Sequence, residues 1–430
     1  MKENYLLKTE QAQRLYSNTA KNLPIIDFHN HITLKDIVND RKFNNIYELW
    51  LECDPYKHRL MRICGIPEFF ITGGAEPYEK FKKYCEIFPH LAGNPVYDWS
   101  RMELSSIFGI NELPCRENAK KIFDATGEML SSSEYTNNAI LSRFNIEYQS
   151  PVASILDELS DFDGKKTAPS LRGDELLLPT EKLKNDLSTA SDIKITDDDS
   201  YTNAICKLLD RFEKADCKFA DHALDDGFFE EDSKKQEILI RLGNEYAKRG
   251  WTLLLHLDAK RKTSSRLRAI AGAAGGYAAS GGRFDTSALC DLLGKMEDSG
   301  ALPRTVLFPL TMSDQTTLAI LEGSFSEDGI KGKIQLGPAW WWCDHSFGIK
   351  NALDSIASFG VLSEFIGMTT DSRSILSFVR HDYFRRIFCS YLDELNSKNE
   401  LDMTYETMTE IVEKVCYKNA YERIKKNEKI

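Results

Sequence analysis

The sequence lacks the features of a membrane protein and of a disulfide-rich secreted protein. Its ten cysteines are scattered over 430 residues without a Cys-x-x-Cys pair, so they indicate no disulfide framework. No apolar run reaches the roughly 20 residues that cross a bilayer, and the N-terminal residues contain no apolar segment of the signal-peptide kind. We therefore expect a reduced, cytoplasmic protein without a membrane partner.

The sequence also has fewer basic residues than acidic ones. Lys and Arg number 55 against 66 Asp and Glu, which gives a formal charge of −11, and no long basic run precedes the final predicted helix. Such a chain offers no basic surface to nucleic acid, so a small molecule is the expected partner. The length allows one large barrel with an insertion, or two to three domains.

The sequence has no Gly-x-Gly-x-x-Gly after its first strand, which argues against an open dinucleotide-binding sheet. The Gly-rich run 271–276 follows no strand directly, and we expect a flexible loop there. Short apolar segments instead recur at helix-sized intervals, and eight strands alternating with helices predict a closed parallel (β/α)8 barrel of the TIM type. The predicted strands are Pro24–His31, Asn145–Gln149, Thr167–Leu171, Lys218–His222, Thr252–Leu257, Thr305–Pro309, Ile334–Gly337 and Phe365–Thr369.

Residues 35–145 have a different sequence pattern from the rest of the chain. Helical segments such as Ile46–Leu51 and Pro77–Phe81 are separated there by Pro and Gly breaks, and no strand is evident. We predict a helical insertion after the first strand, over one mouth of the barrel. The expected division is residues 1–34 (N-terminal helix and first strand), 35–145 (insertion) and 146–430 (remaining barrel and C-terminal helices).

The first predicted strand ends in His29 and His31. Residues i and i+2 of an extended chain point to the same side, so both imidazoles can face one point. An isolated His-x-His is more often two unrelated histidines, but this pair closes a barrel strand, and Asp371 follows the eighth. Two neutral imidazoles and one carboxylate make a three-ligand site with open positions, which suits zinc, iron or manganese.

Other polar residues also follow predicted strands. Chemistry in such barrels collects at the carboxyl ends of the strands, where the sequence places Arg172, Asp221, His222, His256 and Arg373. Arginine forks bind carboxylates in bidentate fashion. Arg172, Arg261 and Arg373 are therefore candidates for binding a carboxylate substrate.

Five segments of the sequence match a known family: 367–374, 380–386, 335–344, 93–99 and 221–224. Through them the chain resembles the uronate isomerase (glucuronate isomerase) family of the amidohydrolase superfamily along nearly its whole length. The resemblance implies a distorted (β/α)8 barrel with a helical insertion and one divalent metal. It also implies interconversion of an aldo-uronate and a keto-uronate, either glucuronate and fructuronate or galacturonate and tagaturonate.

The resemblance also implies roles for individual residues. It gives the metal, expected to be zinc with manganese or iron as alternatives and not strictly required, to His29, His31 and Asp371. The residues that fall where the family binds substrate or lines its site are Arg172, Arg261, Trp341, Arg373, His256 and Asp221, with Tyr56 beside the reacting carbons. Large barrels of this type are usually at least dimers, so a homo-oligomer is expected.

An isomerisation through an enediol needs groups that carry protons at carbon and at oxygen. We expect Tyr56, its pKa lowered by nearby cationic groups, to carry the carbon proton. Asp371 would carry the hydroxyl proton, and Arg373 or Arg261 would stabilise the developing charge.

Two alternatives remain open from the sequence. A metal-dependent hydrolase could use Asp371 as the base for a metal-bound water, because fold does not fix chemistry. A catalytically impaired sugar-acid binding protein is suggested by Pro55, which stands where the family has a histidine before its tyrosine, and by Asp258, where a glycine is usual.

Overall fold

A parallel sheet of seven strands forms the centre of the computed structural model, which describes residues 2–230, 233–282, 284–398 and 402–425. Neighbouring strands in this sheet are all parallel. The chain passes through a helix on most of its returns, as expected of an α/β fold. The order across the sheet is β1 (Ile25–Asn30), β2 (Ile146–Ser154), β3 (Ser170–Arg172), β4 (Phe219–Leu224), β5 (Thr252–Leu257), β8 (Arg304–Pro309) and β9 (Ile334–Leu336).

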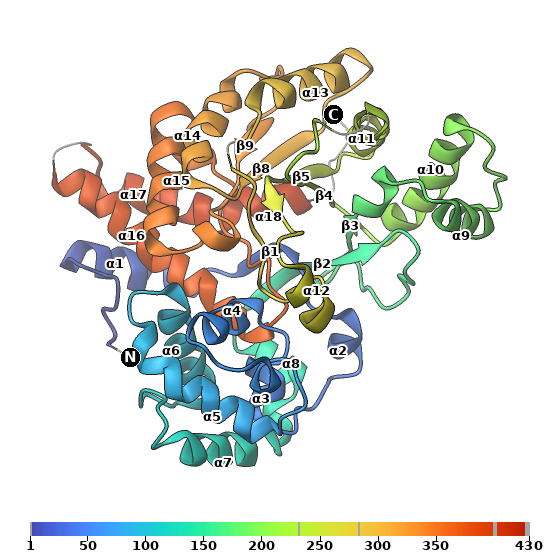
Figure 1. Ribbon diagram of the computed structural model, residues 1–430. Helices are drawn as coiled ribbons and strands as arrows, with labels where there is room; N and C mark the ends of the chain where they lie inside the picture. The colour runs from blue at the N-terminus through green and yellow to red at the C-terminus, as the bar shows by residue number, and fades with distance from the viewer. Residues whose placement is uncertain (1, 231–232, 283, 399–401, 426–430) are drawn as a thin grey trace.

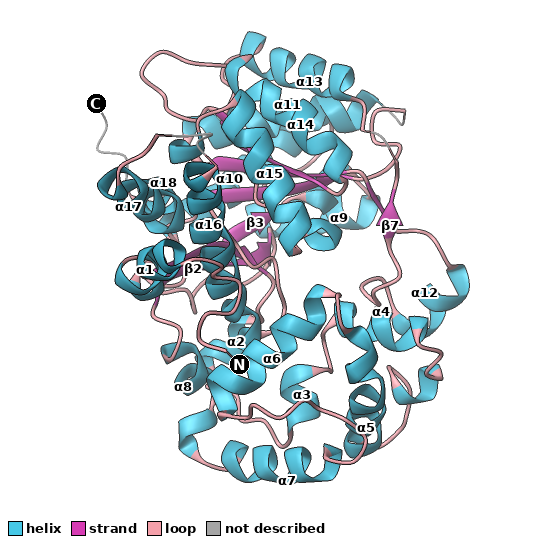
Figure 2. Cartoon of the chain, turned by 90° about the vertical axis from the view of Figure 1, so that its left-hand side faces the viewer, coloured by secondary structure: helices cyan, strands magenta, loops and turns pink. Residues whose placement is uncertain are grey.

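The strands are buried because helices cover the outer side of the sheet. β5 has the sequence Thr-Leu-Leu-Leu-His-Leu and is buried at every position, as continuous apolar strands of parallel sheets are. Figure 2 shows the covering helices stacked along the sheet. They are α11 (Ser233–Lys248), α13 (Thr286–Asp298), α14 (Met312–Ile320) and α15 (Ser346–Phe359).

The prediction of an eighth strand at Phe365–Thr369 is wrong, because this segment forms no strand. Gly367 has φ of +91°, in the left-handed region that breaks an extended ladder. Side chains take the hydrogen bonds that strand neighbours would make: Asn419 Nδ2 donates to the carbonyl of Phe365 at 2.7 Å, and Asp27 Oδ1 accepts from the N–H of Thr370 at 2.7 Å. The described sheet therefore has seven strands and not the eight of a complete barrel.

The segment after Gly367 still lies beside β1. The N–H of Asp371 donates to the carbonyl of His29 at 3.1 Å, and the N–H of His31 donates to the carbonyl of Ser372 at 2.9 Å. These two bonds bring the C-terminal part of the chain to the end of the first strand.

Between β1 and β2, a stretch described throughout, every regular element is a helix. Figure 1 shows these helices, in blue and teal, gathered on one side of the sheet. The division of the chain at residues 34 and 145 stays a prediction. The α-helices are α2 (Leu34–Val38), α3 (Ile46–Trp50), α4 (Pro55–Ile63), α5 (Pro77–Ile87), α6 (Pro95–Phe108), α7 (Ala119–Leu130) and α8 (Asn137–Ser142).

The remaining elements lie outside this group. The predicted N-terminal helix is present as α1, which ends at Asn18. A small antiparallel pair, β6 (Ala259–Lys260) with β7 (Ala279–Ser280), was not anticipated. No helix of the described ranges is long and apolar enough to cross a membrane. The other α-helices are α1 (Glu10–Asn18), α9 (Glu181–Ser191), α10 (Asp198–Lys214), α12 (Ser265–Ala271), α16 (Val379–Ser397), α17 (Tyr405–Glu413) and α18 (Asn419–Ile424).

Candidate active site

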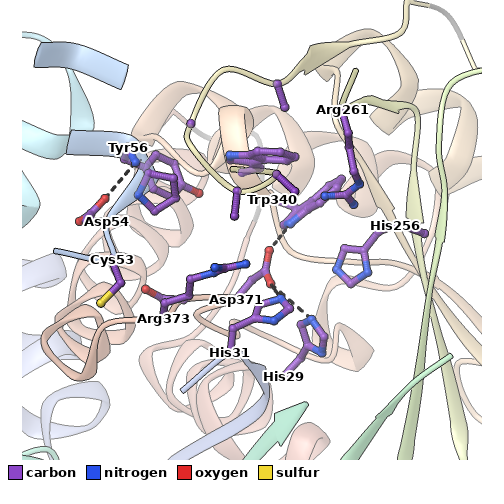
Figure 3. Close-up of a pocket in the computed structure, with 18 of the residues that line it drawn as sticks. His29, His31, Cys53, Asp54, Tyr56, His256, Arg261, Trp340, Asp371 and Arg373 are labelled. Atoms are coloured by element: carbon purple, nitrogen blue, oxygen red, sulfur yellow. Dashed lines mark hydrogen bonds and ion pairs between the residues drawn. The ribbon is translucent and has the colours of Figure 1, made fainter. Parts of the chain in front are cut away.

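One cavity of about 210 Å³ lies at the carboxyl ends of the strands. Residues from β1, β3, β4, β5 and the segment after Gly367 line one side of it, and residues around α4 and α12 line the other (Figure 3). Ten of the residues singled out by sequence lie in its wall: His29, His31, Tyr56, Arg172, Asp221, His256, Arg261, Trp341, Asp371 and Arg373. His222 does not, because it hydrogen-bonds Tyr246 at 2.9 Å.

His29, His31 and Asp371 form a compact cluster. His29 Nε2 lies 3.3 Å and His31 Nε2 lies 3.0 Å from Asp371 Oδ1, and the potential ligand atoms of the three all lie within 4.8 Å of one another. Both ring nitrogens of His29 are buried without a hydrogen bond, which is rare unless another partner binds there. Burial favours a raised pKa at Asp371, but the two imidazoles close to its carboxylate hold the pKa of Asp371 well below its ordinary value. The donor set of this group fits one divalent metal ion.

A second group shares His29. Asp221 Oδ1 lies 2.6 Å from His256 Nδ1, and Asp221 Oδ2 lies 4.0 Å from His29 Nε2. Burial opposes ionisation of Asp221, but its neighbours His256 and His29 lower its pKa below the ordinary value. Because Nδ1 of His256 is engaged, its Nε2 is left buried without a partner. This carboxylate orients His256 toward the cavity.

The tryptophan segment closes one side of the cluster. Trp340 Nε1 donates a hydrogen bond to Asp371 Oδ2 (Figure 3). Trp341 has φ of +47° and stacks on Trp342 at 4.8 Å, while the Arg261 guanidinium lies 5.6 Å from its ring centroid. The sequence singled out Trp341 and missed Trp340, although the adjacent tryptophans were the available signal.

The three arginines differ in their partners. Arg172 pairs with Asp174 at 3.2 Å, and Arg261 pairs with Asp225 at 2.9 Å. Arg373 makes no hydrogen bond or ion pair with the part of the chain that is described. Burial and the neighbouring Arg172 lower the pKa of the Arg373 guanidinium. An anion in the cavity would relieve this repulsion.

Tyr56 enters the cavity from the start of α4. Asp54 caps this helix by accepting from the N–H of Tyr56 at 2.9 Å, and Pro55 occupies the first turn, where its missing N–H costs nothing. The expected lowering of the Tyr56 pKa is wrong. Burial, followed by the nearby Asp344 carboxylate, raises the pKa of Tyr56 well above its ordinary value, and Arg380 only partly offsets this.

The Gly-rich run 271–276 forms part of the cavity wall. Arg62 Nη1 donates to the carbonyl of Gly275, and a Cβ on Gly276 would lie 2.1 Å from the carbonyl oxygen of Pro55. The run therefore packs tightly against α4 instead of standing free, and no pattern in the sequence indicates this contact. Pro55 and, within the run, Ala273, Ala274 and Gly276 also line the cavity. Other lining residues that the sequence did not single out are Cys53, Asp54, Ala223, Ala278, Trp340, Ser372 and Ser374.

Comparison with known proteins agrees with this geometry. The family model described as glucuronate isomerase matches residues 1–239 and 230–423. A uronate isomerase of Caldanaerobacter subterraneus subsp. tengcongensis is 37% identical over 98% of each chain, and one of Haemophilus influenzae (strain PittGG) is 35% identical over the same shares. The crystal structure of the Thermotoga maritima uronate isomerase superposes with a TM-score of 0.90 at 26% identity, covering 99% of each chain. The chain belongs to the uronate (glucuronate) isomerase family of enzymes.

Proposed function

We propose that the cavity interconverts an aldo-uronate and a keto-uronate through an enediol. The observation that carries this proposal is Arg373, a guanidinium that has no acidic partner among the described residues, lies two residues from Asp371 and lines the same cavity. A sugar acid brings a carboxylate for the arginine and hydroxyls for the cluster. Full-length similarity to uronate isomerases favours this reaction over the hydrolase and over an impaired binding protein.

His29, His31 and Asp371 would hold one divalent ion, with zinc the expected metal and manganese or iron the alternatives. When bound, this ion orients and polarises the sugar oxygens as a Lewis acid. Asp221 holds His256 beside the group, and Trp340 fixes one oxygen of Asp371. These neighbours orient the ligands, as outer partners of metal sites do.

The arginines bind the substrate in this proposal. Arg373 receives the carboxylate as a bidentate fork. Arg172 and Arg261 already have acidic partners, so they contribute positive field and not a full ion pair, and Trp341 offers a flat face to the sugar ring. Charge that develops on the enediol oxygens is stabilised by the same guanidinium groups.

Two protons move in the reaction, one between adjacent carbons and one between their oxygens. Tyr56 carries the carbon proton, and Asp371 carries the hydroxyl proton. α4 and the run 271–276 cover the reacting carbons, which excludes water from the enediol. A homo-oligomer and a cytoplasmic location stay predictions.

The test is incubation of the purified protein with glucuronate and, separately, with galacturonate, followed by detection of the keto-uronate. Formation of a ketose from either acid supports the proposal and identifies the preferred substrate. Binding of both acids without any ketose would leave an impaired binding protein, and release of a hydrolysis product from an amide or ester substrate would favour the hydrolase.

A further inference from the structure

Asp344 lies directly behind Tyr56 and outside the cavity wall. It follows the short helix Trp341–Cys343, and its side chain is 6% exposed. Its Oδ2 accepts from the Tyr56 hydroxyl at 3.2 Å and from Arg380 Nη1 at 3.1 Å. Its Oδ1 is buried without any hydrogen-bond partner. Asp344 therefore has one oxygen on the tyrosine and one oxygen free to take a proton.

The ring of Tyr56 is fixed against this carboxylate. Trp99 and Trp342 pack edge-on against it, with ring centroids 5.5 Å and 5.6 Å away. The Arg380 guanidinium lies 4.8 Å from its centroid and 4.0 Å from that of Trp99. A partly buried ring held by such contacts has little rotamer freedom, so the hydroxyl keeps its direction toward Asp344.

Tyr56 faces a chemical difficulty as the carrier of the carbon proton. A phenol whose pKa is raised by burial and by a neighbouring carboxylate does not ionise near neutral pH. It can still accept a proton if it gives up its own at the same time. The only acceptor hydrogen-bonded to its hydroxyl among the described residues is Asp344.

We propose that Asp344 positions Tyr56 and exchanges a proton with it, so that the two side chains act as one acid–base unit. This inference rests on the proposed isomerase function and deepens it. As the C–H bond of the substrate breaks, its electron pair enters the enediolate and its proton goes to the Tyr56 oxygen. The hydroxyl proton of Tyr56 passes to the Asp344 carboxylate. The second half runs in reverse: Tyr56 protonates the adjacent carbon and recovers its proton from Asp344.

The surroundings of Asp344 suit this exchange. Burial raises its pKa to about 7, with Arg380 and the Tyr56 hydroxyl opposing that rise and Asp371 adding to it. Cys343 and Tyr383 are further titratable groups that interact with Asp344. A carboxyl with a pKa near neutrality is matched to both halves of the transfer.

A simpler role for Asp344 is to neutralise the buried Arg380. The chain offers a matched control for that role. Helix α16, which carries Arg380, also carries Asp382. This carboxylate accepts from the Tyr16 hydroxyl and, at 2.8 Å, from Arg386 Nε, so it forms a similar Tyr–Asp–Arg arrangement away from the cavity.

The first experiment compares steady-state kinetics of Asp344→Asn and Asp382→Asn with wild type. We expect Asp344→Asn to lower kcat by about 10²–10⁴-fold with KM within about threefold of wild type, and Asp382→Asn to leave both nearly unchanged. The kcat of wild type should decrease as the pH drops below about 7, because Asp344 becomes protonated, and Asp344→Asn should not show this decrease. The same decrease in Asp344→Asn would overturn the proposed proton exchange. Asp344→Glu keeps an ionisable acceptor, so it should restore the pH dependence and part of kcat, and it also serves if the asparagine variant does not fold.

The second experiment combines Asp344→Asn with Tyr56→Phe. A shared proton path predicts that Asp344→Asn has little further effect on kcat once the hydroxyl is gone. If Asp344→Asn lowered kcat equally in wild type and in Tyr56→Phe, Asp344 would have only the structural role.

A third measurement does not depend on activity. The carbonyl stretch of protonated Asp344, assigned by its loss in Asp344→Asn, should titrate in infrared difference spectra near pH 7 in wild type. Tyr56→Phe should move that midpoint upward, because a hydrogen bond to the ionised form is lost. If the midpoint moves but no uronate is isomerised, the pairing stands and the proposed function fails. An unmoved midpoint would overturn the pairing itself.

Discussion

The two oxygens of the Asp371 carboxylate have different partners: Trp340 Nε1 donates to Oδ2, while Oδ1 faces His29 and His31. The indole thereby fixes the direction in which the second oxygen points. Outer partners of metal ligands commonly change metal affinity by about 10–100-fold.

Trp340→Phe keeps the aromatic bulk and removes the indole N–H. We expect zinc affinity to fall by about 10–100-fold, measured by competition with a chelator of known affinity. Trp251→Phe, a buried tryptophan outside the cavity wall, is the control. Equal affinity in Trp340→Phe and wild type would mean that the hydrogen bond does not orient Asp371.

His29→Ala removes the histidine shared by both ligand groups. We expect the purified variant to contain less than about a tenth of the metal of wild type, measured by elemental analysis after dialysis, because two remaining ligands rarely hold zinc. His90→Ala, at an exposed position, should retain the full metal content. Full occupancy in His29→Ala would place the metal elsewhere.

Arg373→Lys keeps the charge and loses the fork. The ammonium group cannot make the two parallel hydrogen bonds of a guanidinium, so kcat/KM for the uronate should fall at least about tenfold, or about 1.4 kcal/mol. Arg261→Lys should cost less, because Asp225 already occupies that guanidinium. A larger loss of kcat/KM in Arg261→Lys than in Arg373→Lys would mean that Arg261 binds the substrate carboxylate.

Tyr56→Phe removes a hydroxyl and keeps the packing against Trp99 and Trp342. We expect kcat to fall by about 10²–10⁴-fold with little change in substrate binding. Tyr56 returns the substrate's own proton unless it first exchanges that proton with solvent, so in deuterated water a fraction of the product should gain deuterium at the carbon that receives the proton, as mass spectrometry can measure. Full retention of the substrate's own hydrogen together with an unimpaired variant would point to a hydride shift.

Glu322→Gln tests a partly buried carboxyl away from the cavity. Burial raises the pKa of Glu322 to about 7, so the native state holds a proton that the unfolded chain releases at lower pH. Stability from this group is therefore full at low pH and is lost as pH rises toward about 7. The variant should show a smaller fall in Tm across that range than wild type, while the exposed Glu128→Gln should not.

The sequence predicts a strand correctly where the residues of the strand itself determine its conformation. Thr252–Leu257 has the predicted bounds because a continuous apolar run has one reading in a parallel sheet. Phe365–Thr369 has a similar composition but no strand, since Gly367 takes a positive φ and the partners of the segment, Asn419 and Asp27, come from distant parts of the chain.

The candidate site divides in the same way. Residues that follow strands, such as His29 and Asp371, could be found because barrel geometry brings those positions together. Gly276 and Trp340 could not, because their place in the wall depends on contacts with Pro55 and Asp371 that no local pattern encodes. Tyr56 was found, but its pKa was mispredicted because Asp344, the carboxylate beside its hydroxyl, is remote in sequence.

The hydrogen bond between the N–H of Asp371 and the carbonyl of His29 also has a consequence for biosynthesis. His29 and His31 leave the ribosome long before Asp371 does. Because folding of the emerging chain starts from the N-terminus, the nascent protein carries two imidazoles without their carboxylate until residue 371 has emerged. The proposed three-residue metal site would therefore be complete only after that point, and a fragment that stops short of residue 371 would lack its carboxylate.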